Sequence, residues 1–240
     1  QEISLMAICD GKDYLLLPPS RDHKRAFDDN QGPNTGGMGV IAPLDDISDE
    51  LIAQAADQVI QPVLKVLAEQ GRSFIGCIYP GLMITKDGFK VLEINARFGD
   101  PEAQAVFPIL SVDILEVMNE AANGNLGQWL KKRECISHRW NEVHNKNYAV
   151  TVIAASNGYP GEYKKGFEIT GLPKELETIK IFHAGTKYLD GRLLTAGGRV
   201  LAVTGLGASL ESAREHAYEA IRQVKFDGMF YRRDIGKIIN

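Results

Sequence analysis

Apolar residues near the start of the chain form two short runs that flank a turn sequence. Residues 3–9 and 14–17 are mostly apolar, and the sequence CDGKD joins them. An Asp-Gly pair between apolar runs predicts a β-hairpin, because the turn needs residues that tolerate positive φ. A second pair of strands is predicted over 74–85 and 89–96, joined by the turn KDG. Both pairs are expected to be antiparallel.

A helical period marks one long segment between these two pairs. Apolar residues recur every four positions from Leu51 to Val63, which predicts a helix over 48–70. Ser48 is a suitable N-cap, because its side-chain oxygen can accept a hydrogen bond from the first turn. Pro62 is expected to kink or split the helix, since proline has no N–H. Further helices are predicted over 101–107, over 111–124 and after Ser209.

Two polar stretches interrupt the predicted elements. Residues 18–39 contain Pro, Gly and Asn but little apolar periodicity, so we expect a loop, and loops of this length are usually functional or disordered. Residues 125–147 are also polar and irregular, and we place a domain boundary there. Strands are predicted beyond this boundary over 148–156, 179–186 and 198–207.

Charge and cysteine usage narrow the class of protein. The formal net charge is -4, so the charge balance does not point to nucleic acid or to an anionic membrane as a partner. No apolar run has the length that a membrane-spanning helix needs. Cys9, Cys77 and Cys135 are odd in number and far apart, which favours a reducing compartment, the cytoplasm. We expect each of them to be a small buried apolar residue.

The strand KVLEINA carries the first candidate chemistry. Side chains alternate across a strand, so Val91, Glu93 and Asn95 are predicted to share one face, while Leu92 and Ile94 cover a core from the other. Glu93 and Asn95 then present two oxygen ligands side by side. Mg²⁺ takes oxygen ligands, often only one or two from protein, with phosphates and water completing its coordination. A half-exposed strand with a polar face is the plainer interpretation.

The turn after this strand adds three polar side chains. Arg97 can bind a carboxylate or phosphate with its planar fork of N–H donors. Asp100 and Pro101 have the pattern of a helix start, with Asp100 as N-cap and Pro101 at the first helical position. A role of Asp100 toward a substrate would come in addition to this structural role.

The long polar stretch contains a glycine-rich segment, PNTGGMG, at 33–39. Backbone N–H groups in such segments can form an anion-binding concavity. The segment matches neither the P-loop pattern nor G-x-G-x-x-G, and a simple Gly-Gly turn is the usual interpretation. Lys24 and Arg25 lie just upstream and could neutralise phosphate, although a solvated basic patch explains them equally well.

Histidines give no sign of a metal centre. Their positions show no metal-ligand spacing with one another or with the cysteines. We interpret four of them as structural or surface residues: His138, His144, His183 and His216.

Taken in order, these motifs resemble one enzyme family over nearly the whole chain. The segments DHKR, GPNTGGMG, YPGLMIT, KVLEINARFGDPE, GYPGEYKKG, FHAGT, GGRVLAVT and FDGMFYRRDIG closely resemble glycinamide ribonucleotide synthetase, a phosphoribosylamine–glycine ligase of the ATP-grasp superfamily. The resemblance runs from Glu2 to Gly236 and weakens only at about 125–147. It implies ligation of glycine to 5-phosphoribosylamine with ATP, giving glycinamide ribonucleotide, ADP and phosphate through a glycyl-phosphate intermediate.

Site residues follow from the resemblance, position by position. It implies that Glu93 and Asn95 bind Mg²⁺ or Mn²⁺, and that Arg97 and Asp100 lie at the phosphate and substrate-amine end. It implies that Glu2 lies near the nucleotide ribose. The loop facing the ribonucleotide or the phosphates would contain Asp22, Lys24, Arg25, Asn34, Thr35, Gly36 and Gly37.

The resemblance also implies an α/β (α+β) fold in two parts. We expect a larger ATP-grasp subdomain over 1–135, incomplete on its N-terminal side, and a β-rich C-terminal domain over 147–240. The partners would be ATP, glycine, 5-phosphoribosylamine and the N-terminal part of the same enzyme, and the chain alone is expected to be inactive. Two other interpretations stay open: a related carboxylate–amine ligase of purine synthesis, and a non-catalytic association module.

Overall fold

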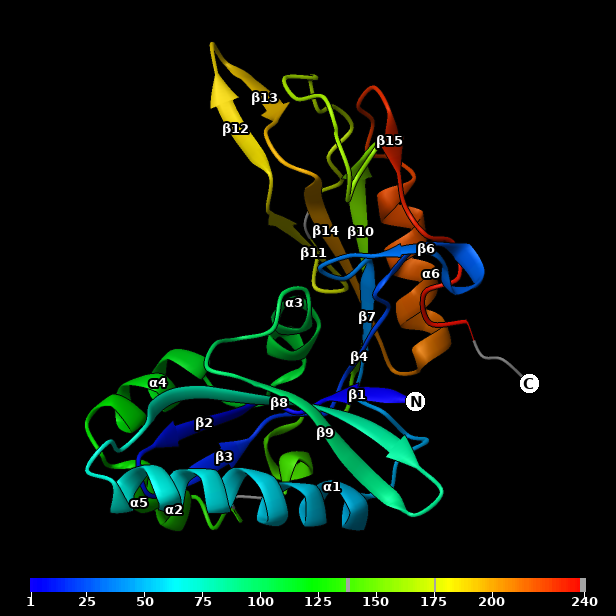
Figure 1. The fold of residues 1–240 in the computed structure, drawn as a ribbon. Coiled ribbons are helices and arrows are strands. Elements are labelled where there is room, and N and C mark those ends of the chain that lie inside the picture. The colour runs from blue at the N-terminus through cyan, green and yellow to red at the C-terminus, as the bar shows by residue number, and fades with distance from the viewer. Residues whose placement is uncertain (137–138, 175, 238–240) are drawn as a thin grey trace. The chain divides into compact units, whose positions relative to one another are not determined.

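The computed structural model describes residues 1–136, 139–174 and 176–237, drawn from blue to red along the chain in Figure 1. It divides into two compact units. Unit 1 comprises Gln1–Arg21 and Ala42–Asn145, and unit 2 comprises Asp22–Ile41 and Lys146–Asn240. Each unit contains its own sheet and its own helices, as the α/β (α+β) prediction requires.

Unit 1 is built on a five-stranded antiparallel sheet. The long strand β8 (Ile75–Thr85) is its centre, with β9 (Gly88–Asn95) paired to it as predicted. The other strands are β1 (Glu2–Ser4), β2 (Ala7–Asp10) and β3 (Tyr14–Leu16), and β1 and β2 both pair with β8. The predicted first hairpin is confirmed as β2–β3, with Cys9 opposite Tyr14, whereas residues 2–4 form a separate strand.

The predicted long helix of unit 1 forms in pieces. Helix α1 (Asp49–Ala55) is followed by one π-helical turn, η2 (Ala56–Ile60), and then by α2 (Gln61–Glu69). Ser48 is the N-cap and accepts a hydrogen bond from the N–H of Leu51 at 3.3 Å, as predicted. Pro62 lies at the start of α2, so the expected break falls in the irregular turn before it.

Several short helical elements complete unit 1 in the part of the chain that the structure describes. The predicted helices over 101–107 and 111–124 are confirmed, the first as a short helix continued by a 3-10 turn. The segment 125–147, expected to be irregular, contains a helix and a 3-10 turn in which Trp129, Leu130 and Trp140 are buried. The elements are α3 (Glu102–Val106) with η3 (Phe107–Ile109), α4 (Ile114–Ala122), α5 (Leu126–Lys132) and η4 (Trp140–Val143).

The sheet of unit 2 has six strands in the order β11-β14-β10-β7-β4, with β15 paired to β10. The predicted strands are confirmed as β10, β11 and β14. Helix α6 (Leu210–Ile221) packs on β10 and β14 and begins at Ser209 with a capping box, as Figure 1 shows in orange. The strands are β4 (Arg21–Asp22), β7 (Gly39–Ala42), β10 (Tyr148–Ser156), β11 (Ile179–His183), β14 (Arg199–Gly207) and β15 (Met229–Phe230).

Close packing between α6 and its sheet depends on glycine. A Cβ at Gly205 would lie 2.2 Å from the carbonyl oxygen of Ala213, and one at Gly207 would lie 2.6 Å from the backbone nitrogen of the same residue. Both distances are far shorter than a carbon atom tolerates, so the helix can approach only a strand that lacks side chains there. Gly205 and Gly207 therefore allow the short distance between α6 and β14.

The expectation that residues 18–39 form a loop is wrong. The segment contains β4, the hairpin of β5 (Arg25–Phe27) and β6 (Gln31–Asn34), and the start of β7. Most of it belongs to unit 2, because β7 joins that unit's sheet and the N–H of Ile153 donates to the carbonyl of Met38. Strands this short give little periodicity, so the sequence pattern did not reveal them.

A second hairpin of unit 2 also lay outside the predictions. It pairs β12 (Thr186–Leu189) with β13 (Arg192–Thr195), joined at Asp190 and Gly191. Both turn residues have positive φ, which explains the Asp-Gly pair.

Two of the three cysteines are buried as predicted. Cys9 and Cys77 are buried in adjacent strands of unit 1, while Cys135 is half-buried, and all three are free thiols. Burial raises the pKa of Cys9 and of Cys77 to about 12. Within the described residues, no helix is both long and apolar enough to cross a membrane.

Candidate functional site

The end of β9 brings the two predicted metal-binding residues together. Asn95 Nδ2 donates a hydrogen bond to Glu93 Oε1 at 3.1 Å. In the register with β8, Glu93 lies opposite Gly81 and Asn95 lies opposite Tyr79, so both side chains share one face of the sheet. Glu93 is exposed and Asn95 half-buried. This part of the sequence prediction agrees with the structure.

The rest of the predicted alternation along β9 is wrong because the strand contains a bulge. Leu82 lies opposite Val91 while Gly81 lies opposite Glu93, so Leu92 is the extra residue. The bulge moves Val91 to the face opposite Glu93. Leu92 and Ile94 do not cover a core in this chain, since they are 51% and 44% exposed. Within the described residues, β9 pairs only with β8, so it is an edge strand with exposed apolar side chains.

The turn after β9 places Arg97 and Asp100 at the surface. Arg97 Nη1 donates to the carbonyl of Phe98 at 2.9 Å, which leaves further N–H donors on its guanidinium. Asp100 does not cap the helix as predicted. Pro101 occupies the N-cap position, and Asp100 Oδ1 instead accepts a hydrogen bond from Gln104 Nε2 at 3.0 Å. The helix begins one residue later than the sequence pattern indicated.

A buried carboxylate anchors this turn, and sequence reasoning assigned it no role. Glu102 is 3% exposed, and its Oε1 accepts hydrogen bonds from Tyr79 and, at 3.2 Å, from Ser4. A Cβ on Gly99 would lie 2.6 Å from Glu102 Oε2, so only glycine fits there. Because Tyr79 is paired with Asn95 on the neighbouring strand, this network links the turn to the strand that carries the two residues predicted to bind a metal. The position of Glu102, an acid directly after Asp-Pro at a predicted helix start, is the sequence feature that could have indicated its structural role.

The donor set at the end of β9 fits a hard cation of the Mg²⁺ type. A carboxylate and an amide oxygen lie side by side at an exposed strand end, open to phosphates and water that would complete the coordination. The described residues contain no group of three or more His, Cys, Asp or Glu side chains that could hold a metal by themselves. A metal here would therefore depend on oxygen atoms of a bound ligand.

The predicted binding residues of the first 37 positions fall in both units. Glu2 lies in unit 1, half-buried on β1 and opposite Met83. The others lie in unit 2 and form one connected segment there. Lys24 Nζ pairs with Asp22 Oδ2 at 3.4 Å, and Arg25 Nη1 donates to the carbonyl of Gly32 at 2.8 Å. Arg25 also lies opposite Asn34 in the β5–β6 hairpin.

Thr35 holds the start of the glycine-rich segment. Its N–H and its hydroxyl both donate to the carbonyl of Lys24, each at 2.8 Å. The hydroxyl also accepts a hydrogen bond from the N–H of Gly37 at 3.0 Å. Gly37 has φ +110°, a conformation that side-chain-bearing residues rarely adopt.

The backbone of the two glycines is already engaged by the protein. The N–H of Gly36 donates to the hydroxyl of Tyr159 at 3.1 Å, and its carbonyl accepts from Arg199 Nη1 at 2.6 Å. Together with the bond from Gly37 to Thr35, this uses both N–H groups that were expected to bind an anion. The alternative of a structured Gly-Gly turn fits better. Tyr159 and Arg199 were missed, because they are distant in sequence.

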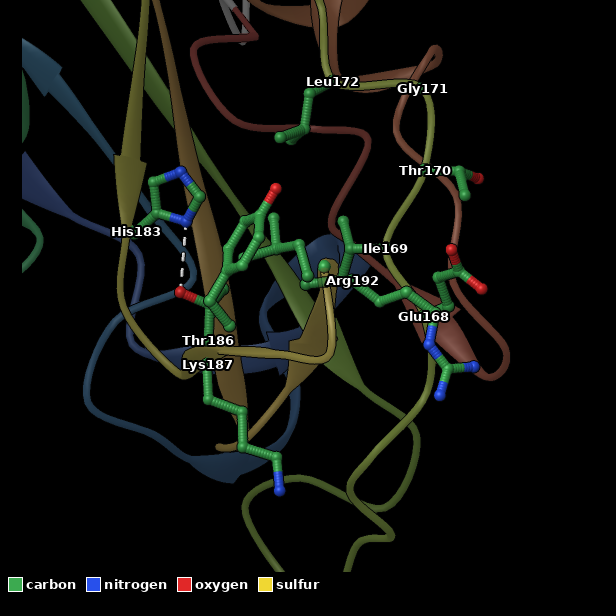
Figure 2. A pocket seen from close by; sticks show the side chains of 12 residues that line it. Glu168, Ile169, Thr170, Gly171, Leu172, His183, Thr186, Lys187 and Arg192 are labelled. Atoms are coloured by element: carbon green, nitrogen blue, oxygen red, sulfur yellow. Dashed lines mark hydrogen bonds between the residues drawn. The ribbon is translucent and has the colours of Figure 1, made fainter.

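A separate hollow of about 640 Å³ lies between the β12–β13 hairpin and residues 168–172 of unit 2. Figure 2 shows His183 beside Thr186, whose hydroxyl is 3.1 Å from His183 Nδ1. Lys187 extends away from His183, and Arg192 and Glu168 lie apart from both. The charged groups do not converge on one point, and the lining contains none of the residues predicted to bind a ligand.

The interpretation of the histidines agrees with their contacts. His183 is exposed, His216 Nδ1 lies 2.7 Å from the carbonyl oxygen of Leu206, and His144 packs against Trp140. His138 lies outside the described residues.

Comparison with family models gives two matches. Residues 1–103 match the ATP-grasp (A) domain of phosphoribosylglycinamide synthetase, and residues 149–238 match the C domain of the same family.

Curated relatives cover nearly the whole chain. A phosphoribosylamine–glycine ligase of Synechocystis is 45% identical over 98% of this chain and 54% of the relative, and one of Caldanaerobacter subterraneus is 43% identical with the same coverage. The human trifunctional purine biosynthetic protein adenosine-3 is 42% identical over 98% of this chain and 22% of the relative. The chain thus spans about half the length of the ligases that it matches.

Solved structures agree with the sequence comparisons. The phosphoribosylamine–glycine ligase of Thermotoga maritima matches with a TM-score of 0.83 and 36% identity, over 98% of this chain and 55% of that one. The biotin carboxylase domain of a single-chain bacterial carboxylase has a TM-score of 0.62 at 15% identity, over 96% and 49%, which shows a shared fold. The predicted resemblance and the α+β ATP-grasp fold are confirmed, and the chain belongs to the phosphoribosylglycinamide synthetase family.

Proposed function

We propose that the chain is part of an ATP-dependent ligase that joins glycine to 5-phosphoribosylamine. The matches to both the ATP-grasp and the C domain of one ligase family carry this proposal. The oxygen pair of Glu93 and Asn95 at the end of β9 supports it, because a nucleotide–metal site needs such ligands. The products are glycinamide ribonucleotide, ADP and phosphate.

The reaction has two displacements. A carboxylate oxygen of glycine attacks the γ-phosphorus of ATP, the bond to the bridging oxygen breaks, and ADP leaves with that electron pair. The amine of phosphoribosylamine then attacks the carbonyl carbon of the glycyl phosphate, inorganic phosphate leaves, and the nitrogen loses a proton. The protein contributes mainly by positioning the reactants and by neutralising charge.

At the end of β9, Glu93 and Asn95 would hold Mg²⁺ or Mn²⁺. When bound, the cation neutralises phosphate charge. Arg97 would bind phosphate oxygens with the N–H groups that it does not donate to Phe98. Asp100 would face the substrate amine, and Gln104 holds its carboxylate in place. Glu2 would bind the nucleotide ribose.

In unit 2, the segment from Asp22 to Gly37 would bind the ribonucleotide. Lys24 and Arg25 supply cations, and Asn34 supplies an amide, at the open end of the β5–β6 hairpin. Because the N–H groups of Gly36 and Gly37 are bonded within the protein, we assign these glycines and Thr35 to holding the segment in shape. This differs from direct binding of phosphate by the backbone.

Turnover is proposed to need the rest of the enzyme. The chain corresponds to about half of the related ligases, and β9 exposes Val91, Leu92 and Ile94 along an edge. Exposed apolar edge strands are normally covered in natural proteins. The free thiols Cys9, Cys77 and Cys135 support the further proposal that the enzyme works in the cytoplasm, a reducing compartment.

The proposal is tested by assaying ADP formation by the full-length enzyme that contains this chain. We expect ADP only when ATP, glycine, phosphoribosylamine and Mg²⁺ are all present, and loss of activity with EDTA that Mg²⁺ or Mn²⁺ restores. Equal turnover with a different carboxylate in place of glycine would contradict the proposed substrate. The chain alone should be inactive, and measurable turnover by it would contradict the need for the rest of the enzyme.

A further inference from the structure

A buried arginine of unit 2 makes a set of contacts that the proposed function does not use. Arg232 is 1% exposed, and its guanidinium binds the carboxylate of Asp234 through two hydrogen bonds, of 2.8 Å from Nε and 2.6 Å from Nη2. Burying a charged group is costly unless it is paired and hydrogen-bonded. The remaining N–H groups of the paired guanidinium donate hydrogen bonds to a distant part of the chain, residues 25 and 30.

These remaining donors reach the β5–β6 hairpin. Arg232 Nη1 donates to the carbonyl of Arg25 at 3.1 Å, and Nη2 donates to Asn30 Oδ1 at 3.2 Å. The bonds join residues more than 200 positions apart in the sequence. A planar guanidinium has the fixed geometry needed to bind a carboxylate and two further acceptors at once, which a lysine cannot reproduce.

The tip of the hairpin has an unusual backbone. Asp29 and Asn30 are consecutive, and both have φ +55°. Left-handed conformations are uncommon for residues other than glycine, although Asp and Asn tolerate them best. Two such residues in a row need support from their surroundings to persist as the main conformation.

The C-terminal segment supplies this support residue by residue. Asn30 is bound by Arg232, the N–H of Asp29 donates to Asp234 Oδ2 at 2.9 Å, and Asp28 Oδ1 accepts from the N–H of Arg233 at 2.6 Å. Three consecutive residues of the hairpin tip are therefore held by three residues of the sequence RRD. We call this set of contacts, between 28–30 and 232–234, the hairpin clamp.

Side chains of α6 bind the backbone of the C-terminal part of the clamp. The hydroxyl of Tyr218 donates to the carbonyl of Arg232 at 2.8 Å and accepts from the N–H of Ile235 at 3.1 Å. Arg214 donates to the carbonyls of Arg233 and Ile235, at 2.9 Å and 3.1 Å. Residues 232–235 are thus fixed to a helix of the same unit before they contact the hairpin.

The opposite end of the hairpin carries the residues proposed to bind the ribonucleotide. Arg25 and Asn34 face each other in its ladder, and the N–H of Thr35 donates to the carbonyl of Lys24 at 2.8 Å. The clamp contacts Arg25 through its backbone carbonyl and not through its side chain, which is exposed and donates from Nη1 to the carbonyl of Gly32. A shift at the tip would rotate the short ladder and move its open end.

We propose that Arg232 and Asp234 are positioning residues for phosphoribosylamine, acting through the β5–β6 hairpin without touching the substrate. This inference rests on the proposed function, because it takes the open end of the hairpin as the ribonucleotide-binding element. The clamp fixes the two left-handed residues at the tip and thereby presets the arrangement of Lys24, Arg25 and Asn34. The substrate then does not have to order the hairpin when it binds.

The test compares three variants of the full-length enzyme. Arg232→Lys keeps the positive charge but loses the planar guanidinium that binds several acceptors at once. Asn30→Ala removes one acceptor from an exposed turn and leaves the buried residues unchanged. Both should raise the KM for phosphoribosylamine roughly tenfold or more, with the KM for ATP changed less than about twofold. Arg222→Lys is the matched control, since Arg222 Nε donates only to the carbonyl of Tyr218 on α6 in the described contacts, and it should change neither KM.

A further variant and an amide-exchange measurement distinguish a positioning role of the clamp from a general loss of stability. Asn30→Gly loses the same acceptor but tolerates positive φ, so its KM for phosphoribosylamine should rise less than that of Asn30→Ala. Amide exchange of Asp29 and Arg233 should speed up in Arg232→Lys while exchange within α6 stays slow. If Arg232→Lys fails to fold, the two Asn30 variants decide the question.

The outcomes distinguish this inference from the proposed function. An active wild-type enzyme whose Asn30→Ala variant keeps its KM for phosphoribosylamine would overturn the inference alone. Equal rises of both KM values in the variants would also overturn it, because they indicate a general loss of structure. A wild-type enzyme that does not use phosphoribosylamine at all would overturn the proposed function and this inference together.

Discussion

The end of β9 and the segment from Asp22 to Gly37 use their polar groups in opposite ways. On β9, Glu93 is exposed and bonds to its neighbour Asn95, and in the turn that follows Arg97 donates to the carbonyl of Phe98 and Asp100 accepts from Gln104. In the other segment, Thr35, Gly36 and Gly37 are bonded through side chain and backbone to the rest of unit 2. The end of β9 presents polar side chains to the solvent, whereas the segment from Asp22 to Gly37 uses its polar groups for hydrogen bonds that hold its own conformation.

This difference separates two ways of building a binding surface. A regular sheet is rigid without side-chain help, so side chains at its end remain available to bind a cation and phosphates. An irregular segment has no ladder long enough to fix it, so it needs internal hydrogen bonds and the hairpin clamp to keep one conformation. Substitutions at the end of β9 should therefore lower activity with little effect on stability. Substitutions that break the internal bonds of the other segment should change its conformation, and with it both stability and substrate binding.

The largest expected effect is that of Glu93→Ala in the full-length enzyme. Losing one of the two proposed oxygen ligands should lower kcat/KM by roughly hundredfold or more, about 2.7 kcal/mol of activation free energy. The free energy of unfolding should change by less than about 0.5 kcal/mol, because Glu93 is exposed. Steady-state kinetics and urea unfolding measure the two quantities.

Lys90→Ala is the control on the same strand, since Lys90 is also exposed and lies opposite Met83. It should leave both quantities nearly unchanged. Activity of Glu93→Ala within tenfold of wild type would exclude Glu93 as an essential metal ligand.

A smaller effect, on stability, is expected for Thr35→Val. The substitution removes the hydroxyl that accepts from the N–H of buried Gly37 and donates to the carbonyl of Lys24. Leaving a buried N–H without a partner should destabilise unit 2 by about 1–2 kcal/mol. Amide exchange of Gly37 and urea unfolding of the chain measure this, and Thr35→Ser, which keeps the hydroxyl, is the control. Equal stability of both variants would show that the segment does not depend on these bonds.

The smallest effect concerns pH and Asp234. Burial opposes ionisation of this carboxylate, but hydrogen bonds from Arg232 and from the N–H of Asp29 outweigh it and lower its pKa to about 2, from an ordinary 3.8. A lowered pKa stabilises the fold above pH 3.8, and that contribution is lost as the pH falls through about 2. Asp234→Asn should lower the stability of unit 2 at pH 7 by about 1 kcal/mol, because the buried Arg232 guanidinium keeps a neutral acceptor but loses the charge that is paired with it.

Urea unfolding at several pH values tests this linkage. The stability difference between Asp234→Asn and wild type should narrow between pH 4 and pH 2. A difference that stays constant over this range would mean that the pKa of Asp234 is not lowered, and would argue against the ion pair of Asp234 and Arg232 as part of the hairpin clamp.

Several elements could be predicted because they depend on interactions between residues close together in the sequence. The Asp-Gly turn of the first hairpin, and the caps at Ser48 and Ser209, depend on residues within a few positions of each other. The β8–β9 pair was predictable for the same reason, since the turn KDG joins its two strands directly. The placement of Glu93 and Asn95 on one face of β9 followed from strand periodicity, whereas their proposed role as metal ligands was implied by the family resemblance.

Other features required knowledge of distant partners. The bulge at Leu92 reverses the predicted face of Val91, and nothing in the strand's own sequence marks it. The Asp-Pro pattern suggested a cap at Asp100, whereas the chain turns there and Pro101 takes that position. Glu102 carried a recognisable charge, but its burial depends on Ser4 and Tyr79, which come from two other strands.

By itself, the sequence determined the family, the local elements and the side-by-side placement of Glu93 and Asn95, because these depend on motif order and on contacts between near neighbours. Only the tertiary structure decided that residues 22–41 join the C-terminal unit and that the glycines of PNTGGMG bond to Tyr159 and Arg199. It also decided that Arg232 holds the hairpin tip. The reason is physical: buried polar groups must find partners, and the folded chain supplies those partners from residues more than a hundred positions away.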